Sequence, residues 1–164
     1  MIPTIALSVR QPWAWAILHA GKDIENRSAA AVRHGMKPGR IALHAAKGMT
    51  RAEYEHAAGF MASIGVRCPA PAQLIRGGII GSVTISEIIS EHDSEWFFGP
   101  RGLVLEGPTA CAAIPSTGAL GYFKWTRSEG TLAPPAKWML DWNQAGTPPV
   151  EPAAADLPLF PEAD

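Results

Sequence analysis

This chain lacks the sequence signatures of the common metal-dependent and nucleotide-hydrolysing enzymes. It contains no glycine-rich phosphate loop, no His-Glu-x-x-His pair and no Cys-x-x-Cys pair. Its two cysteines, Cys68 and Cys111, show neither metal-ligand spacing nor a disulfide framework. Ser116 lies between a proline and a threonine, which is not the context of a nucleophile elbow. We therefore predict reduced thiols and no metal ligands.

Long apolar runs are also missing. No segment approaches the roughly 20 apolar residues that a membrane-spanning helix needs, so no membrane association is predicted. Residues 1–4 lack the basic and apolar regions of a signal peptide, and we expect a cytoplasmic protein. Apolar residues nevertheless make up 47% of the 164 residues, which predicts one folded domain with a single core.

Charge is nearly balanced overall but uneven along the chain. The net charge is −1, and residues 144–164 carry four acidic residues and no basic one. Residues 1–51 contain only two acidic residues against eight basic ones, namely Arg10, Lys22, Arg27, Arg33, Lys37, Arg40, Lys47 and Arg51. A basic N-terminal third is typical of proteins that bind phosphates. An ordinary solvated surface, balanced by acids elsewhere, explains the same pattern equally well.

Predicted strands and helices alternate along the chain. One helix is predicted to begin at Pro12 and end at Gly21, because proline suits a first helical position and glycine suits a C-terminal cap. A second is predicted to begin at Thr50, with Glu53 completing a capping box, and to end near Gly65. Residues 33–40 are predicted to be a loop, residues 73–76 a connecting element and residues 137–143 a last short helix. Apolar and β-branched patterns predict strands at residues 5–9, 23–27, 41–45, 78–90, 103–106 and 120–125.

The order of these elements predicts an α+β fold around a small barrel or curled sheet. Gly81, inside the longest predicted strand, indicates a bulge or a sharp bend. We predict one domain over residues 1–143. Residues 144–164 are rich in proline, alanine and acids, which predicts a flexible tail.

Several blocks of residues 4–127 resemble ASCH domains. They include Leu-Ser-Val-Arg-Gln-Pro-Trp-Ala at residues 7–14, Gly-Lys at 21–22 with Glu-Asn-Arg at 25–27, and Gly-Arg-Ile-Ala-Leu-His-Ala-Ala-Lys at 39–47. Weaker matches follow at residues 78–83, 99–105, 114–115 and 118–121. The resemblance implies a PUA-like small β-barrel surrounded by α-helices, with RNA as the partner. It fixes the fold better than the reaction.

The reaction stays open because ASCH proteins include binding modules, ribonucleases and a branch that hydrolyses N4-acetylated cytidine nucleosides. In that branch the lysine after the first helix is catalytic, with a threonine three residues later and a downstream glutamate. Lys22 matches the lysine, whereas Glu25 stands at the position of the threonine. Glu87, Glu91 and Glu95 all compete for the downstream position.

The residues that follow the first predicted helix form the strongest candidate site. Lys22 is able to hold a phosphate or, if burial lowers its pKa, to act as a base; a surface lysine at a helix end is the structural alternative. Glu25 and Arg27 share one face of the predicted strand. Glu25 can accept a hydrogen bond from a base amine, transfer protons or help to hold Mg²⁺, and Arg27 can bind a phosphate or stack on a base. An internal Glu–Arg pair is the structural alternative.

Further candidates surround this segment. Lys47 is predicted to be a second phosphate ligand or a catalytic lysine. His44 is predicted to be either a nucleic-acid ligand or a hydrogen-bonded interior histidine. Trp13 and Trp96 are the preferred base-stacking residues, whereas Trp15 and Trp125 are predicted to lie in the core. The predicted nucleic-acid-binding set is Arg10, Gln11, Trp13, Arg27, Arg40, His44, Trp96 and Ser116, and the predicted catalytic set is Lys22, Glu25 and Lys47.

These residues predict a cytoplasmic protein that binds single-stranded RNA in a basic cleft, with ribonuclease activity, supported by Mg²⁺ if a metal takes part, as the first enzymatic hypothesis. An amidohydrolase acting on N4-acetylcytidine-type nucleosides is the second. A non-catalytic adaptor is the third, because residues 156–160 (Asp-Leu-Pro-Leu-Phe) resemble peptides that dock on the bacterial sliding clamp. Leu157, Leu159 and Phe160 would be its apolar anchors.

Overall fold

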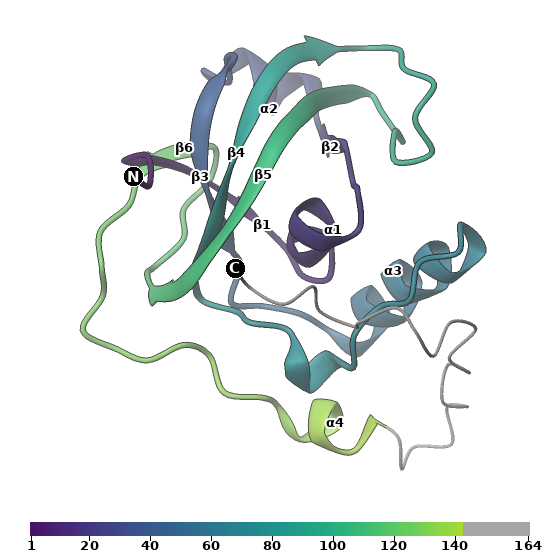
Figure 1. Cartoon of the computed structure of the whole chain (residues 1–164), viewed down its shortest axis with the longest axis vertical. Coiled ribbons are helices and arrows are strands. Elements are labelled where there is room, and N and C mark those ends of the chain that lie inside the picture. Colours follow the sequence, from purple (N-terminus) through teal and green to yellow (C-terminus); the bar gives the residue numbers. More distant parts are fainter. Residues whose placement is uncertain (143–164) are drawn as a thin grey trace.

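A strongly curled six-stranded sheet forms the centre of the molecule. The computed structural model describes residues 1–142, and its sheet has the strand order β2-β5-β4-β3-β1-β6. The strands are β1 (Ile5–Val9), β2 (Ile24–Arg27), β3 (Gly39–Ala45), β4 (Gly78–Ile89), β5 (Arg101–Pro115) and β6 (Tyr122–Lys124). Strands β1 and β3 are parallel, and the other neighbours are antiparallel. Figure 1 shows the sheet as a half-barrel.

Within residues 1–142, four α-helices and one 3₁₀ turn accompany the sheet. They are α1 (Trp13–His19), α2 (Ala29–Arg33), α3 (Arg51–Ser63), the turn η1 (Pro71–Gln73) and α4 (Lys137–Leu140). Helix α1 lies inside the curl of the sheet, and α3 lies beyond it (Figure 1). The α+β, PUA-like architecture predicted from the sequence is confirmed.

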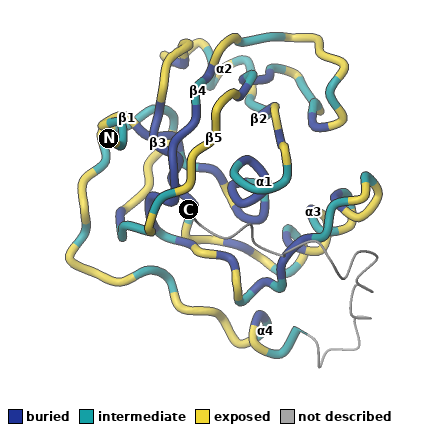
Figure 2. Tube along the Cα trace, viewed as in Figure 1, coloured by how far each residue is buried: buried dark blue, intermediate teal, exposed yellow. Residues whose placement is uncertain are grey.

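The apolar core follows the inner face of the sheet. Leu7, Val9 and Leu43 pack there against Ala14 and Ile17 of α1, in one cluster with residues of β4 and β5. Figure 2 shows that most residues of β3 and of β4 are buried. A second cluster joins Trp15 of α1 to Tyr54 and Met61 of α3, so α1 separates the two halves of the core.

Bulges allow β4 and β5 to curl. The register between them shifts at three places, and the first shift lies between Ile79 and Gly81. A Cβ atom at Gly81 would collide with Thr109 O and the Leu18 side chain. Because only glycine allows this close approach, the bend predicted at Gly81 is confirmed.

Strand β5 and helix α2 depart from the sequence prediction. The strand predicted at residues 103–106 extends from Arg101 to Pro115. The segment from Gly107 onward is rich in glycine, proline and alanine, yet it continues to pair with β4 across the register shifts. Helix α2 was not predicted; it begins after Ser28, whose side chain accepts a hydrogen bond from Ala31 N at 3.1 Å.

Other local predictions agree with the structure within a few residues. Thr50 caps α3, accepting a hydrogen bond from Glu53 N at 3.1 Å. Gly21 follows α1 with a φ of +72°, as expected of a glycine that ends a helix. Cys68 and Cys111 are both free. Within residues 1–142, no helix has the length and apolarity needed to span a bilayer. The predicted tail at residues 144–164, with Leu157, Leu159 and Phe160, lies outside the described residues.

Candidate nucleotide-binding pocket

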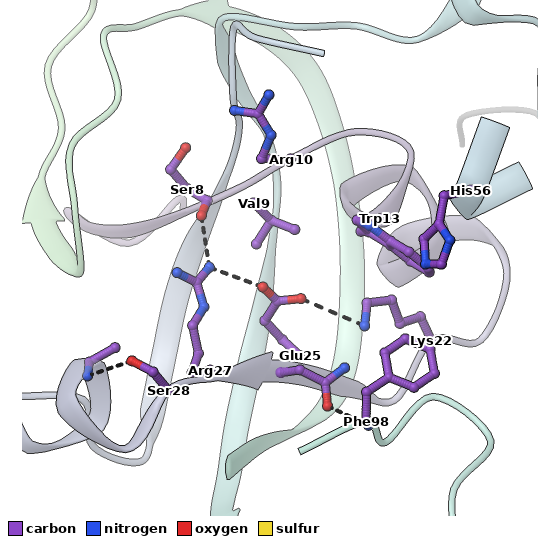
Figure 3. Close-up of a pocket in the computed structure, with 12 residues that line it drawn as sticks. Ser8, Val9, Arg10, Trp13, Lys22, Glu25, Arg27, Ser28, His56 and Phe98 are labelled. Carbon is purple, nitrogen blue, oxygen red and sulfur yellow. Dashed lines mark hydrogen bonds and ion pairs between the residues drawn. The ribbon is translucent and has the colours of Figure 1, made fainter. Parts of the chain in front are cut away.

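A pocket of about 540 Å³ opens where β1 ends and β2 begins. Its walls come from both strands, the start of α1, α2, α3 and the loop between β4 and β5 (Figure 3). A volume of this size lies within the range of small-molecule sites. The pocket is lined by Ser8, Val9, Arg10, Trp13, Lys22, Glu25, Asn26, Arg27, Ser28, Ala31, His56 and Phe98.

Lys22 lies at the floor of this pocket, and its side chain is only 1% exposed. Its Nζ atom donates a hydrogen bond to Ile24 O and lies 3.6 Å from Glu25 Oε1. The same ammonium group lies 5.4 Å from the ring centre of Trp13 and 5.7 Å from that of Trp96. Burial lowers the pKa of Lys22, and the negative charge of Glu25 partly opposes this shift. Lys22 is therefore a desolvated cation held between two indole rings and a carboxylate.

Glu25 connects Lys22 to Arg27. Its other carboxylate oxygen, Oε2, lies 3.0 Å from Arg27 Nη2, which also donates a hydrogen bond to Ser8 O at 2.8 Å. The Glu–Arg pair expected from the strand alternation is therefore present, and it lies inside the pocket. The buried Nε atom of Arg27 has no hydrogen-bond partner within the part of the chain that the structure describes. The Lys22–Glu25–Arg27 group thus combines two cations with one carboxylate, and beside it lies a buried N–H group without a partner.

Aromatic rings form the wall opposite Arg27. Trp13 makes edge contacts with Trp96 and Phe98, at centroid distances of 6.4 Å and 6.0 Å. Phe60 of α3 packs against both of these rings and Trp13. Phe98 is 53% exposed at the mouth, whereas Trp96 is buried beneath Lys22. Trp13 and Phe98 therefore present aromatic surface to the pocket, and Trp96 supports it from behind.

Arg10 and His56 belong to the rim. Arg10 lines the pocket and donates from Nη2 to Glu53 Oε1 at 2.8 Å. This hydrogen bonding raises the pKa of Arg10 and lowers the pKa of Glu53, because it stabilises the charged form of each group. His56 follows Glu53 on α3 and is exposed. The first turns of α3 thus bring a carboxylate and an imidazole to the rim.

Three predicted nucleic-acid ligands make internal hydrogen bonds outside this pocket. Gln11 is buried; its Oε1 accepts from Trp15 N and its Nε2 donates to Ile75 O, both at 2.8 Å. His44 lies between Ser8 Oγ and Ser116 O, each 2.8 Å from a ring nitrogen. Ser116 is itself buried. The structure therefore does not bring these three side chains to the pocket.

Arg40 and Lys47 also lie away from the pocket. Arg40 binds the hydroxyl groups of Ser82, Thr84 and Thr109 on the surface of β3, β4 and β5. Lys47 is exposed after β3 and does not line the pocket. Arg10, Trp13, Lys22, Glu25 and Arg27 are the predicted site residues that the structure brings together.

The geometry around His44 predicts a pH-dependent stability. Ser116 O can only accept, so Nε2 carries the proton and Nδ1 accepts from Ser8 Oγ. Burial lowers the pKa of His44, so the unfolded chain binds more protons just below the ordinary histidine pKa. The free energy of unfolding should therefore fall as pH decreases from about 6.5 toward the lowered value.

Urea unfolding at pH 7.5 and pH 5.5 measures this effect, with His44→Gln as the comparison. The variant is expected to be less stable at both values, because a buried hydrogen-bonded ring is lost, but to lose less stability on acidification than the wild type. His19, whose pKa is also lowered by burial, remains in both proteins. An identical pH dependence in the two proteins would show that His44 does not contribute.

Five polar or aromatic residues of the pocket were not predicted from the sequence: Ser8, Asn26, Ser28, His56 and Phe98. Asn26 belongs to the Glu-Asn-Arg motif at residues 25–27, and Ser28 stands where a helix N-cap is expected. The sequence near each of these two residues could therefore have indicated its place. His56 and Phe98 come from distant segments and carried none.

The pocket does not suit Mg²⁺, because this ion favours several oxygen ligands at once and the described part of the pocket offers a single carboxylate. Glu25 is the only Asp or Glu among the described lining residues, and both of its oxygens face cations. Within residues 1–142, no group of three or more His, Cys, Asp or Glu side chains could hold a metal ion.

The curled sheet, with α1 inside it and a polar pocket at the end of β1, defines a PUA-like module. A family model described as the ASCH domain matches residues 7–135. The chain therefore belongs to the ASCH domain family, as its motifs predicted. No curated protein matches its sequence.

Proposed function

We propose that this protein is a cytoplasmic RNA-binding module that takes one unpaired nucleotide of a single-stranded RNA into the pocket. The observation that carries the proposal is the buried Lys22–Glu25 pair beneath an open aromatic mouth. A desolvated ammonium and a carboxylate can together donate to and accept from the edge of a base. Such an edge is accessible only where the base is unpaired.

The remaining groups of the pocket fit the rest of a nucleotide. Trp13 and Phe98 offer surfaces for base stacking, which tolerates any base. The Arg27 side chain is 21% exposed inside the pocket and Arg10 lies at its rim, so both can contact a phosphate. A phosphate at Arg10 would compete with Glu53. The proposal therefore assigns the base to the Lys22 end and the phosphates to the two arginines.

Fluorescence anisotropy with a labelled single-stranded RNA and the matching duplex tests this function. We expect the single strand to bind at least tenfold more tightly, and its affinity to fall with salt, with a log–log slope of about −0.7 for each phosphate contact. Nucleoside 5′-monophosphates should compete. Arg40→Gln is the control, because it removes a basic side chain outside the pocket. Equal affinity for duplex and single strand, or no competition, would overturn the proposal.

Hydrolysis of an N4-acylated cytidine is the second candidate function, and the burial of Lys22 favours it. Its lowered pKa makes the neutral amine, and hence a base, more accessible. Glu25 occupies the place of the threonine in the deacetylating branch, and Glu87, Glu91 and Glu95 are exposed and do not line the pocket. Release of cytidine from N4-acetylcytidine by the wild type but not by Lys22→Ala would support it. No release would remove it.

RNA cleavage remains the enzymatic form of the main proposal. Arg10 and Arg27 are placed to stabilise charge on a phosphate, Lys22 would hold the base, and Glu25 and His56 are lining residues able to transfer a proton. Labelled RNA incubated with Mg²⁺ or with EDTA, using wild type, Lys22→Ala and Lys47→Ala, tests it. Cleavage that survives both substitutions would indicate another site or a contaminant.

A further inference from the structure

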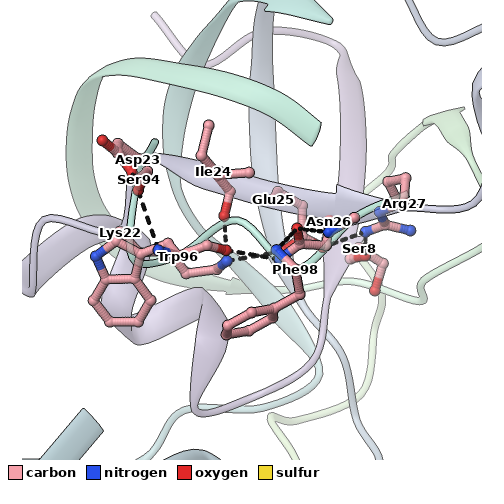
Figure 4. Close-up of polar contacts among 11 residues, drawn as sticks. Ser8, Lys22, Asp23, Ile24, Glu25, Asn26, Arg27, Ser94, Trp96 and Phe98 are labelled. Carbon is pink, nitrogen blue, oxygen red and sulfur yellow. Dashed lines mark hydrogen bonds and ion pairs between the residues drawn. The ribbon is translucent and has the colours of Figure 1, made fainter. Parts of the chain in front are cut away.

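Asn26 connects the strand that carries the charged groups to the loop that carries the aromatic wall. Its Nδ2 donates to Trp96 O at 2.9 Å, and its Oδ1 accepts from Phe98 N at 2.7 Å and from Gly99 N at 3.2 Å (Figure 4). One amide thus satisfies three backbone groups of the loop between β4 and β5. A second connection joins Asp23 to Ser94 at the start of this segment.

The anchored stretch contains both rings that define the wall. Trp96 lies beneath Lys22, and Phe98 lies at the mouth against Trp13 and Phe60. Phe98 is half exposed, so packing alone does not fix it. The two hydrogen bonds to Asn26 Oδ1 hold its backbone directly and the next residue as well. The position of the Phe98 ring therefore depends on Asn26.

We propose that Asn26 is a positioning residue that sets the aromatic wall against which the bound base stacks, and that it acts through Phe98. This inference rests on the proposed function, since it assumes that a base enters the pocket. It assigns Asn26 a role in recognition of the base and none in recognition of the phosphate. Its neighbours on β2, Glu25 and Arg27, would instead bind the polar groups of the nucleotide.

Isothermal titration calorimetry with the four nucleoside 5′-monophosphates and with ribose 5-phosphate tests the inference. Asn26→Ala and Phe98→Ala should each weaken the tightest nucleotide roughly tenfold, the loss of one stacking contact. Ribose 5-phosphate, which has no base, should bind all variants equally. The double variant should bind about as weakly as Phe98→Ala alone, because Asn26 acts through that ring.

Amide hydrogen exchange adds a measurement without ligand. Asn26→Ala should speed exchange at Phe98 and Gly99. Asn26→Asp keeps both acceptor bonds but loses the donor to Trp96 O, so it should restore slower exchange in part. Tyr54→Phe is the matched control: it removes a buried bond to Pro69 O, 2.6 Å long, that holds a different loop. The control should leave nucleotide affinity unchanged.

Two results would overturn the inference alone: additive effects of Asn26→Ala and Phe98→Ala, or an equal loss of affinity for ribose 5-phosphate. Failure of the wild type to bind any of the nucleotides would instead overturn the proposed function, and the inference with it.

Discussion

Replacing Lys22 with methionine is expected to weaken nucleotide binding roughly 100-fold, the value of one hydrogen bond to a charged group. The same variant should unfold at an unchanged or higher temperature. Methionine fills the space of the lysine stem and removes a charge whose burial opposes folding. Glu25 does not become an unpaired charge in the variant, because Arg27 remains 3.0 Å away. Opposite effects on binding and stability identify a residue retained for function.

Thermal unfolding and calorimetric titration of the same samples test this expectation. Lys124→Met is the matched control, since Lys124 is an exposed lysine on β6. The stability gained by Lys22→Met should shrink as pH approaches about 10.5, where the unfolded lysine loses its proton and the wild type no longer carries the penalty. Unchanged affinity would exclude Lys22 from the site. A large fall in unfolding temperature would make it a structural residue.

The local part of the site could be predicted because its charges lie close together in the sequence. Lys22, Glu25 and Arg27 lie within six residues that follow α1 and include all of β2. Strand alternation places Glu25 and Arg27 on one face, and their ion pair follows from that geometry. The structural interpretation of this pair is confirmed, because Arg27 binds both Glu25 and Ser8 O. Both residues also line the pocket, and their role in binding a ligand stays a prediction.

The distant part of the site could not be predicted from local pattern. His56 and Phe98 reach the pocket only because the curl of the sheet brings α3 and the β4–β5 loop to the end of β1. Conversely, Gln11 and His44 have the chemistry of ligands, but each has two internal hydrogen-bond partners. Residue type reveals that a buried polar group needs partners and does not reveal which partners it finds.

The fold shows a similar division. The strands at β1, β3 and β4 carry continuous apolar patterns and were predicted within a few residues. The second half of β5 has little apolar pattern of its own, because Gly107, Pro108 and the alanines that follow are poor strand formers. Its conformation is set by pairing with β4, a tertiary contact that local propensity does not contain.

Replacing Glu25 with leucine is expected to destabilise the protein by about 3 kcal/mol, because it leaves a buried lysine without its counter-charge. Lys22 would then keep the hydrogen bond to Ile24 O and its contacts with two indole rings, without any counter-charge in contact, and Arg27 would keep its bond to Ser8 O. Loss of the carboxylate should lower the pKa of Lys22 further, since the charge of Glu25 is the largest of the influences that oppose the effect of burial. The stability of this variant should therefore rise more steeply with pH than that of the wild type.

The double variant Lys22→Met/Glu25→Leu separates the ion pair from general packing. It should recover most of the stability lost in Glu25→Leu, because no buried lysine remains to be neutralised, while nucleotide binding stays lost. Chemical denaturation of the wild type, both single variants and the double variant gives the coupling energy. Additive effects would mean that Lys22 and Glu25 contribute independently. A coupling energy that favours the intact pair would mean that the carboxylate of Glu25 keeps a charged lysine at the floor of the pocket, where it can bind a base.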